Sequence, residues 1–126
     1  MKVRPFKNEA FTDFSKPKNY KMQLDALQDV KNKLGKTYEI IIGGKKIKTE
    51  KTFSSINPSN VDEVIARFYK GTPELVETAV QTASKAFDNW KYVPAEDRAA
   101  LLLKAAEITK RRRFEINAYM ILEAGK

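Results

Sequence analysis

Residues 94–125, PAEDRAALLLKAAEITKRRRFEINAYMILEAG, carry the pattern that decides how this chain folds. Apolar side chains recur through the stretch at helical spacing, which predicts a long helix with a break or kink near residues 111–114. Pro94 suits a helix start, and Gly125 stands where a helix commonly ends in a left-handed residue. A helical run this apolar needs packing partners, and we expect few of them within the chain. The pattern therefore predicts the opening portion of a larger protein.

The segment before this run predicts another helix, from Thr72 to Trp90. Thr72 is a favoured N-cap residue, and Pro73 and Glu74 suit the first turn. The helix has one apolar stripe, which consists of Val76, Ala79, Val80, Ala83, Phe87 and Trp90. Such a stripe is more typical of a core-facing side than of an aromatic platform for a ligand.

The first third of the chain predicts an extended arm followed by a helix. Residues 1–15 contain Pro5 and several aromatic residues without helical spacing. In residues 16–34 the apolar positions recur in steps of three and four, as on one face of a helix. Gly35 then occupies the position of a helix C-terminal glycine.

Four short runs of strand-forming residues lie at 38–42, 45–49, 53–56 and 64–69. Gly43-Gly44 joins the first two runs, and both glycines can adopt the positive φ angles of a tight hairpin turn. Because all four runs are close in sequence, we expect antiparallel hairpins. The chain alone is therefore predicted to be α+β: a helix, short antiparallel hairpins, then three helices.

The composition excludes several kinds of chemistry. The chain has 126 residues and contains neither Cys nor His. Disulfides, thiolate nucleophiles and the usual zinc ligands are therefore absent from it. No apolar stretch approaches the roughly 20 residues of a membrane-spanning helix. The first residues also lack the apolar segment of a signal peptide, so a cytoplasmic location is the default expectation.

The charge of the chain is strongly positive, with 24 Lys and Arg against 16 Asp and Glu. Its densest cluster is Lys110–Arg113, which would suit nucleic acid or would simply be a solvated helix end. We favour the helix end, since the sequence lacks the interleaved aromatics of single-strand binders. The carboxylates of Glu107, Glu115 and Glu123 are interpreted as surface charges.

Three blocks of sequence together resemble the aldehyde dehydrogenase superfamily. They are residues 38–49 with the following Ser55-Ile56-Asn57-Pro58, residues 83–90 (ASKAFDNW), and residues 94–126 from PAEDR to LEAGK. Residues 6–14 (FKNEAFTDF) and 34–38 (LGKTY) narrow the resemblance to the bacterial 1-pyrroline-5-carboxylate dehydrogenases within this superfamily.

The resemblance implies an α/β parent enzyme in which residues 16–126 are the N-terminal part of the NAD-binding domain. Such an enzyme oxidises L-glutamate γ-semialdehyde to L-glutamate with NAD in proline degradation, and a Cys attacks the aldehyde. The resemblance also implies that the remainder of the dehydrogenase chain is the main partner and that the parent is a homo-oligomer. We assign no catalytic and no NAD-contacting residue here, and we expect the 126-residue chain to be inactive by itself.

The resemblance suggests one site. Some family members hold a monovalent cation between a main-chain oxygen before the "NP" turn and an acidic residue before "GK", which correspond here to Ile56 and Glu123. Oxygen ligands suit a hard cation. This sequence has Glu where those members have Asp, and the alternative is an exposed Glu123 paired with a nearby Lys.

Two other interpretations come from different functional classes. The chain could be a small basic binding protein for nucleic acid or a protein partner. It could also be a regulatory piece that docks on a complete dehydrogenase. An in-frame continuation with a Cys nucleophile downstream of codon 126 would favour the dehydrogenase.

Overall fold

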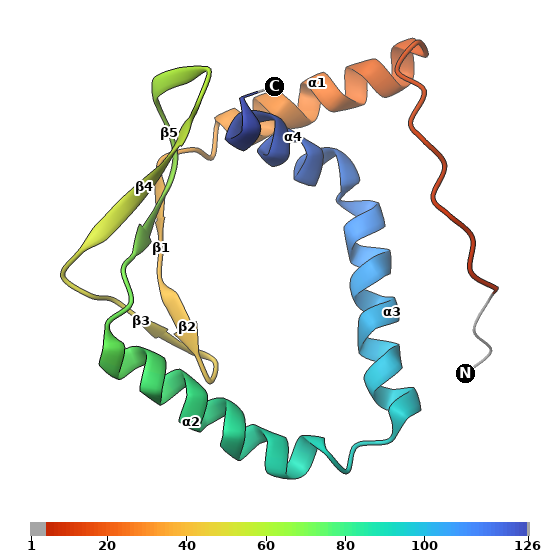
Figure 1. Cartoon of the computed structure of the whole chain (residues 1–126). Helices are drawn as coiled ribbons and strands as arrows, with labels where there is room; N and C mark the ends of the chain where they lie inside the picture. Colours follow the sequence, from red (N-terminus) through yellow and green to blue (C-terminus); the bar gives the residue numbers. More distant parts are fainter. Residues whose placement is uncertain (1–4, 126) are drawn as a thin grey trace.

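The computed structural model describes residues 5–125 and has the outline of an open ring (Figure 1). Its elements are α1 (Pro17–Lys31), β1 (Lys36–Tyr38), β2 (Ile40–Ile42), β3 (Lys45–Ile47), β4 (Thr52–Asn57), β5 (Asn60–Tyr69), α2 (Pro73–Trp90), α3 (Ala95–Arg111) and α4 (Arg113–Ala124). The helices α1 and α4 lie together, the strands form one side of the ring, and α2 and α3 complete it. The arm that precedes α1 runs down the outside, next to α3.

The hairpin at Gly43-Gly44 is confirmed. Gly43 and Gly44 have φ angles of 56° and 78°, and β2 pairs with β3 in antiparallel fashion. The expected strand at 38–42 is split, because Glu39 separates β1 from β2. The Glu39 carboxylate instead lies 3.7 Å and 3.6 Å from the ammonium groups of Lys46 and Lys48.

The other sheet has the strand order β1-β5-β4. β4 and β5 are antiparallel, which confirms the second expected hairpin. β1 runs parallel to β5, a pairing that the sequence did not predict. Gly35 explains this placement: with a φ angle of 77° it turns the chain out of α1, and its N–H donates to the Ile65 carbonyl. The Arg67 guanidinium also donates to the Gly35 carbonyl, at 3.0 Å.

The helix boundaries follow the local signals. The Thr72 hydroxyl accepts a hydrogen bond from the Leu75 amide, which confirms the cap of α2. The predicted break in the last helical run is also confirmed, since Arg112 separates α3 from α4. Gly125 closes α4 in the left-handed conformation, with φ 66° and ψ 33°.

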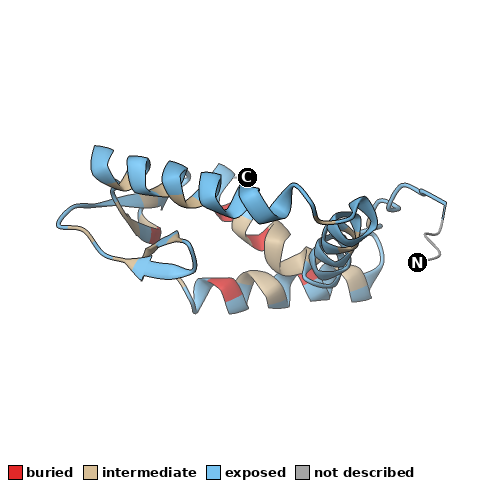
Figure 2. Ribbon diagram, turned by 90° about the horizontal axis from the view of Figure 1, so that it is seen from below, coloured by how far each residue is buried: buried red, intermediate tan, exposed pale blue. Residues whose placement is uncertain are grey.

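The small core lies where α1 crosses α4 and meets the sheet (Figure 2). Val30 and Ala118 are fully buried there. Leu122, Ile65 and Ala66 surround them and are nearly as buried. The expectation that the last helical run has few partners is therefore wrong for part of α4, because Ala118 and Leu122 are buried against α1 and the sheet, whereas Met120 stays 62% exposed.

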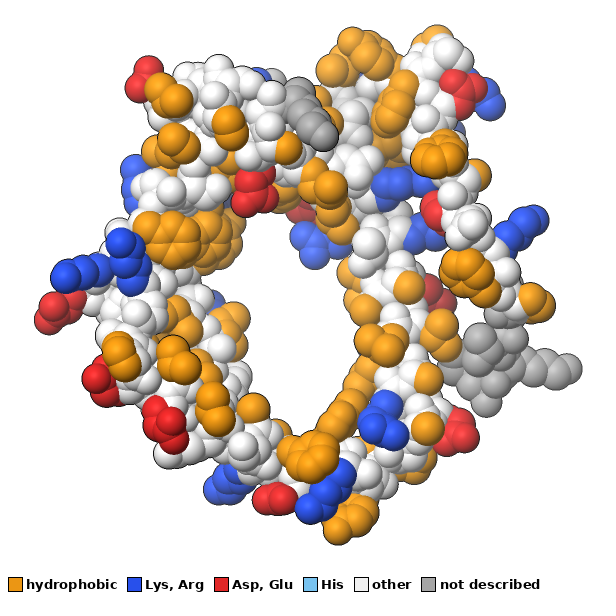
Figure 3. All heavy atoms as spheres, in the orientation of Figure 1, with side chains coloured by type: hydrophobic (Ala, Val, Ile, Leu, Met, Phe, Trp, Pro, Cys, Tyr) orange, Lys and Arg blue, Asp and Glu red, His pale blue; other side chains and the backbone are white. Residues whose placement is uncertain are grey.

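The helices α2 and α3 contribute no buried residue. Phe87 on the α2 stripe is 58% exposed, so the prediction that this stripe faces a core is wrong within this chain. On α3, Leu102 is 75% exposed, as expected for a helix that lacks partners. Apolar side chains line parts of the central opening in Figure 3.

The accessible surface measures how open the molecule is. It amounts to 10540 Å², whereas a compact monomer of this mass would expose about 6,800 Å². The unpacked sides of α2 and α3 and the extended arm, in which Phe11 is fully exposed, contribute to this excess. No helix within residues 5–125 is long and apolar enough to cross a membrane.

Candidate functional site

The turn between β4 and β5 holds the end of α4. The Ser59 hydroxyl donates to the Gly125 carbonyl at 2.6 Å. The turn itself is rigid, because the Ser59 amide donates to the Asn57 side-chain oxygen at 2.9 Å. The Asn57 amide group is buried and donates to the Glu63 carboxylate at 2.8 Å. The bonds within the β4–β5 turn hold its shape, and the bond from Ser59 attaches the last turn of α4 to it.

Gly125 fits this support because it has no side chain. A Cβ atom at this position would lie 2.8 Å from the Ser59 hydroxyl oxygen and 3.1 Å from the Ser59 amide nitrogen. Its positive φ angle also disfavours any residue with a Cβ.

A series of three glycine-to-alanine substitutions separates these two effects. Gly125→Ala combines a positive φ angle with a steric clash, and we expect it to cost about 2–3 kcal/mol of folding free energy. Gly44→Ala has only the positive φ angle and should cost about 1 kcal/mol. Gly71→Ala has neither, since nothing lies within 4 Å of a Cβ there, and should be close to neutral. Denaturant titration measures all three, and equal losses for Gly125→Ala and Gly71→Ala would contradict the described contact.

The predicted cation ligands lie at this junction. The β4–β5 ladder changes register on both sides of Ile56, so regular strand pairing is interrupted at that residue. Glu123 is exposed, two residues before Gly125, and makes no salt bridge within residues 5–125. The structure therefore brings the two chain segments together, and the cation site itself stays a prediction. No group of three or more acidic residues suited to a metal occurs in the described part.

The basic cluster is bound to acidic groups of the chain itself. The Lys110 ammonium lies 2.9 Å from the Glu9 carboxylate, and the Arg113 guanidinium donates to the same carboxylate at 3.2 Å. Arg112 makes two hydrogen bonds to Glu115, at 2.8 Å and 3.2 Å. The two Glu9 pairs join the N-terminal arm to the α3–α4 junction. Because Lys110, Arg112 and Arg113 already face carboxylates, the cluster does not favour the nucleic-acid interpretation.

Protonation of Glu9 is expected to release the arm. The hydrogen bond from Lys110, supported by the charge of Arg113, lowers the Glu9 pKa below its ordinary value of 4.5. A lowered pKa means that the contribution of Glu9 to arm docking is complete above about pH 4.5 and disappears as the pH falls through the lowered value. ¹⁵N NMR relaxation of the arm amides between pH 3 and 6 measures the release, because a released arm moves faster than a docked one.

Glu9→Gln is the matched control for this titration. It should leave the arm weakly docked at every pH, and high salt should have a similar effect because the pairs are exposed. Arm mobility that is independent of pH in the unaltered chain would contradict the proposed role of Glu9.

The start of α2 does not fit a dinucleotide phosphate. The Thr72 hydroxyl already accepts from the Leu75 amide, and Pro73 has no N–H to offer. Glu74 places a carboxylate at the same helix end, and a hydrogen bond with Thr72 lowers the pKa of that carboxylate. The β5–α2 connection therefore does not suit a phosphate group.

Comparison with known sequences decides the family. The sequence model of the aldehyde dehydrogenase family matches residues 46–126. This chain belongs to the aldehyde dehydrogenase family. Similar relatives within the aldehyde dehydrogenases are the 1-pyrroline-5-carboxylate dehydrogenase of Oceanobacillus iheyensis, 47% identical, and that of Staphylococcus haemolyticus, 46% identical. Each match covers 98% of this chain and 24% of the relative.

Solved aldehyde dehydrogenase structures share the fold. A 1-pyrroline-5-carboxylate dehydrogenase from Thermus with bound NAD has a TM-score of 0.95 and 38% identity, over 100% of this chain and 24% of that one. A Mycobacterium tuberculosis enzyme has a TM-score of 0.84 at 21% identity, which supports the fold alone. The chain thus spans about a quarter of the length of these aldehyde dehydrogenases.

Proposed function

We propose that this chain is the N-terminal quarter of an NAD-dependent dehydrogenase that oxidises L-glutamate γ-semialdehyde to L-glutamate. The observation that carries the proposal is the extent of the similarity. Relatives named 1-pyrroline-5-carboxylate dehydrogenase match 98% of the chain, including residues before position 46, where the general family model begins. In this proposal residues 16–126 form the first part of the NAD-binding domain of a homo-oligomeric enzyme.

The contribution of this chain to catalysis is structural. The chain has no Cys, so the nucleophile of the family must come from the remainder of the enzyme. NAD supplies hydride acceptance when it is bound there. The residues described above instead build a support: the α1–α4 core fixes one corner of the ring, and the apolar sides of α2 and α3 offer packing surface to the nucleotide-binding part.

A chimeric enzyme tests this proposal. Residues 1–126 of this chain would replace the matching quarter of the Oceanobacillus iheyensis enzyme. We expect the chimera to produce NADH from NAD and the semialdehyde. The 126-residue chain alone and the remainder alone should produce none. An inactive, unfolded chimera would contradict the proposal, as would NADH production by the isolated chain.

We also propose that the Ile56 main-chain oxygen and the Glu123 carboxylate hold a monovalent cation in the complete enzyme. The bond between Ser59 and Gly125 supports this, because it fixes the end of α4 at the turn that follows Ile56. Both residues are exposed, so water can supply further oxygen ligands. Replacing Na⁺ by choline should lower the melting temperature of the chimera. Glu123→Gln should abolish that difference, whereas the control Glu107→Gln should preserve it. No dependence on the cation would refute the site.

A further inference from the structure

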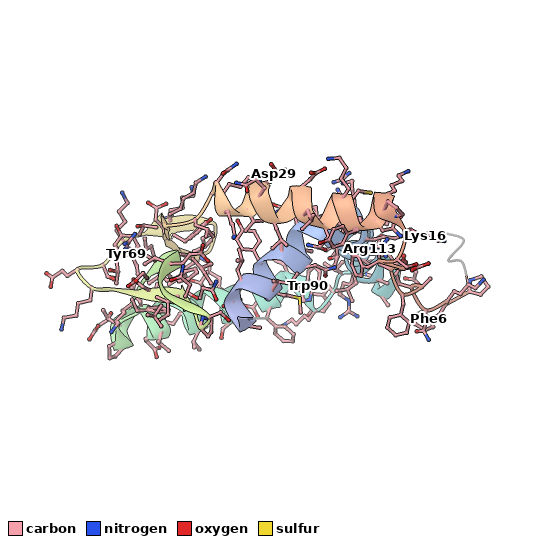
Figure 4. All side chains as sticks on the ribbon, turned by 90° about the horizontal axis from the view of Figure 1, so that it is seen from above. Phe6, Lys16, Asp29, Tyr69, Trp90 and Arg113 are labelled. Atoms are coloured by element: carbon pink, nitrogen blue, oxygen red, sulfur yellow. The ribbon has the colours of Figure 1, made fainter. Side chains whose placement is uncertain are left out.

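An apolar groove of about 500 Å³ lies between α1 and α4. Tyr20, Leu24 and Leu27 of α1 line one wall, and Met120, Ile121 and Ala124 of α4 line the other. Leu24 is 47% exposed in this groove. Figure 4 shows α1 lying over α4, with Phe6 of the arm away from both helices.

One polar atom in the groove region lacks a partner. Gln23 is 7% exposed, and its side-chain amide donates to the Phe114 carbonyl at 3.2 Å. Its side-chain oxygen is buried and accepts no hydrogen bond from residues 5–125. A buried acceptor without a donor is costly. Because this oxygen is buried, an element that enters the groove does not reach it, and the groove offers a mainly apolar surface.

The position of Ala124 indicates what covers the groove. Ala124 lines the groove, and Gly125 turns the backbone immediately beyond it. The relatives are about four times as long as this chain. In a protein of that length, the polypeptide after residue 126 starts at the rim of the groove. Because this polypeptide is covalently joined to α4, its effective concentration at the groove is high.

We propose that the α1–α4 groove is the docking site of the first element that follows residue 126 in the complete protein. This element is amphipathic, and its apolar side fills the groove. The proposal rests on the proposed function, since it requires the complete dehydrogenase.

Thiol labelling of the chimera tests the docking. This chain contains no Cys, so Leu24→Cys and the control Lys21→Cys each introduce a single thiol into its region. The Lys21 side chain is 75% exposed and belongs to the same helix. In the folded chimera we expect the Leu24→Cys thiol to react at least about tenfold more slowly than the Lys21→Cys thiol. In urea the two rates should be equal. Met120→Cys, on the opposite wall of the groove, repeats the measurement from α4, and its thiol should also react slowly with the label.

A thiol-linked benzophenone at the exposed Lys21→Cys position, next to the groove-lining Tyr20, identifies the occupant without filling the groove. The expected cross-link joins α1 to the first element after residue 126 of the same molecule. A cross-linked dimer, a cross-link to residues 5–13 of the arm, or one to a distant segment would overturn the inference. Equal labelling rates in an active, folded chimera would also overturn it while leaving the proposed function intact. An inactive chimera would count against the proposed function instead.

Discussion

Val30→Asp is expected to separate α1 from α4 and to unfold the core of this chain. Val30 is fully buried against Ala118 and Leu122, and no cation lies among these core residues to neutralise an added carboxylate. Burying an unpaired charge costs about 4 kcal/mol or more, which exceeds what so small a core can supply. Hydrogen exchange should show loss of amide protection throughout both helices.

Val61→Asp is the matched control for this substitution. Val61 is 67% exposed in β5, so the same chemical change should alter the folding free energy by less than about 0.5 kcal/mol. If the amides of α1 and α4 stayed protected from hydrogen exchange in Val30→Asp, the described core would not be what holds the two helices together.

Val80→Asp is expected to have opposite outcomes in the isolated chain and in the chimera. Val80 belongs to the apolar stripe of α2 and is 55% exposed among residues 5–125. In the isolated chain the new carboxylate stays in water, so the exchange protection of α1 and α4 should not change. In the chimera the stripe is covered, and the substitution should cost about 3 kcal/mol or more and lower the yield of active enzyme.

Gln81→Asp is the control on the opposite face of α2. It introduces the same charge one residue further along and should leave both proteins nearly unchanged. If Val80→Asp were harmless in an active chimera, the claim that the remainder of the enzyme covers α2 would be wrong.

The features predicted correctly from the sequence depend on neighbouring residues. Gly43-Gly44 specifies the hairpin because both positions require a positive φ angle. Thr72 caps α2 with its own hydroxyl, and Gly125 ends α4 by a backbone conformation. Each of these signals acts within a few residues, so a single sequence suffices to recognise it.

The features that were missed depend on distant residues or on a partner. The parallel pairing of β1 with β5 joins Lys36 to Ala66, and no local pattern specifies that register. The pairing of Glu9 with Arg113 spans 104 positions. The α2 stripe was correctly recognised as apolar, but residues 5–125 leave it unburied. At the candidate site, the sequence suggested Ile56 and Glu123, whereas the supporting bond from Ser59 to Gly125 had no sequence signal.

The crossing of α1 and α4 also has a consequence for biosynthesis. Gln23 bonds to Phe114, 91 residues later, so the first helix leaves the ribosome long before its partner exists. At ordinary rates of translation this interval lasts roughly 5–20 s. During that time the apolar side of α1 is open to chaperones and to other nascent chains. Slow codons between the two helices would lengthen this exposure, and the yield of enzyme would depend on translation speed.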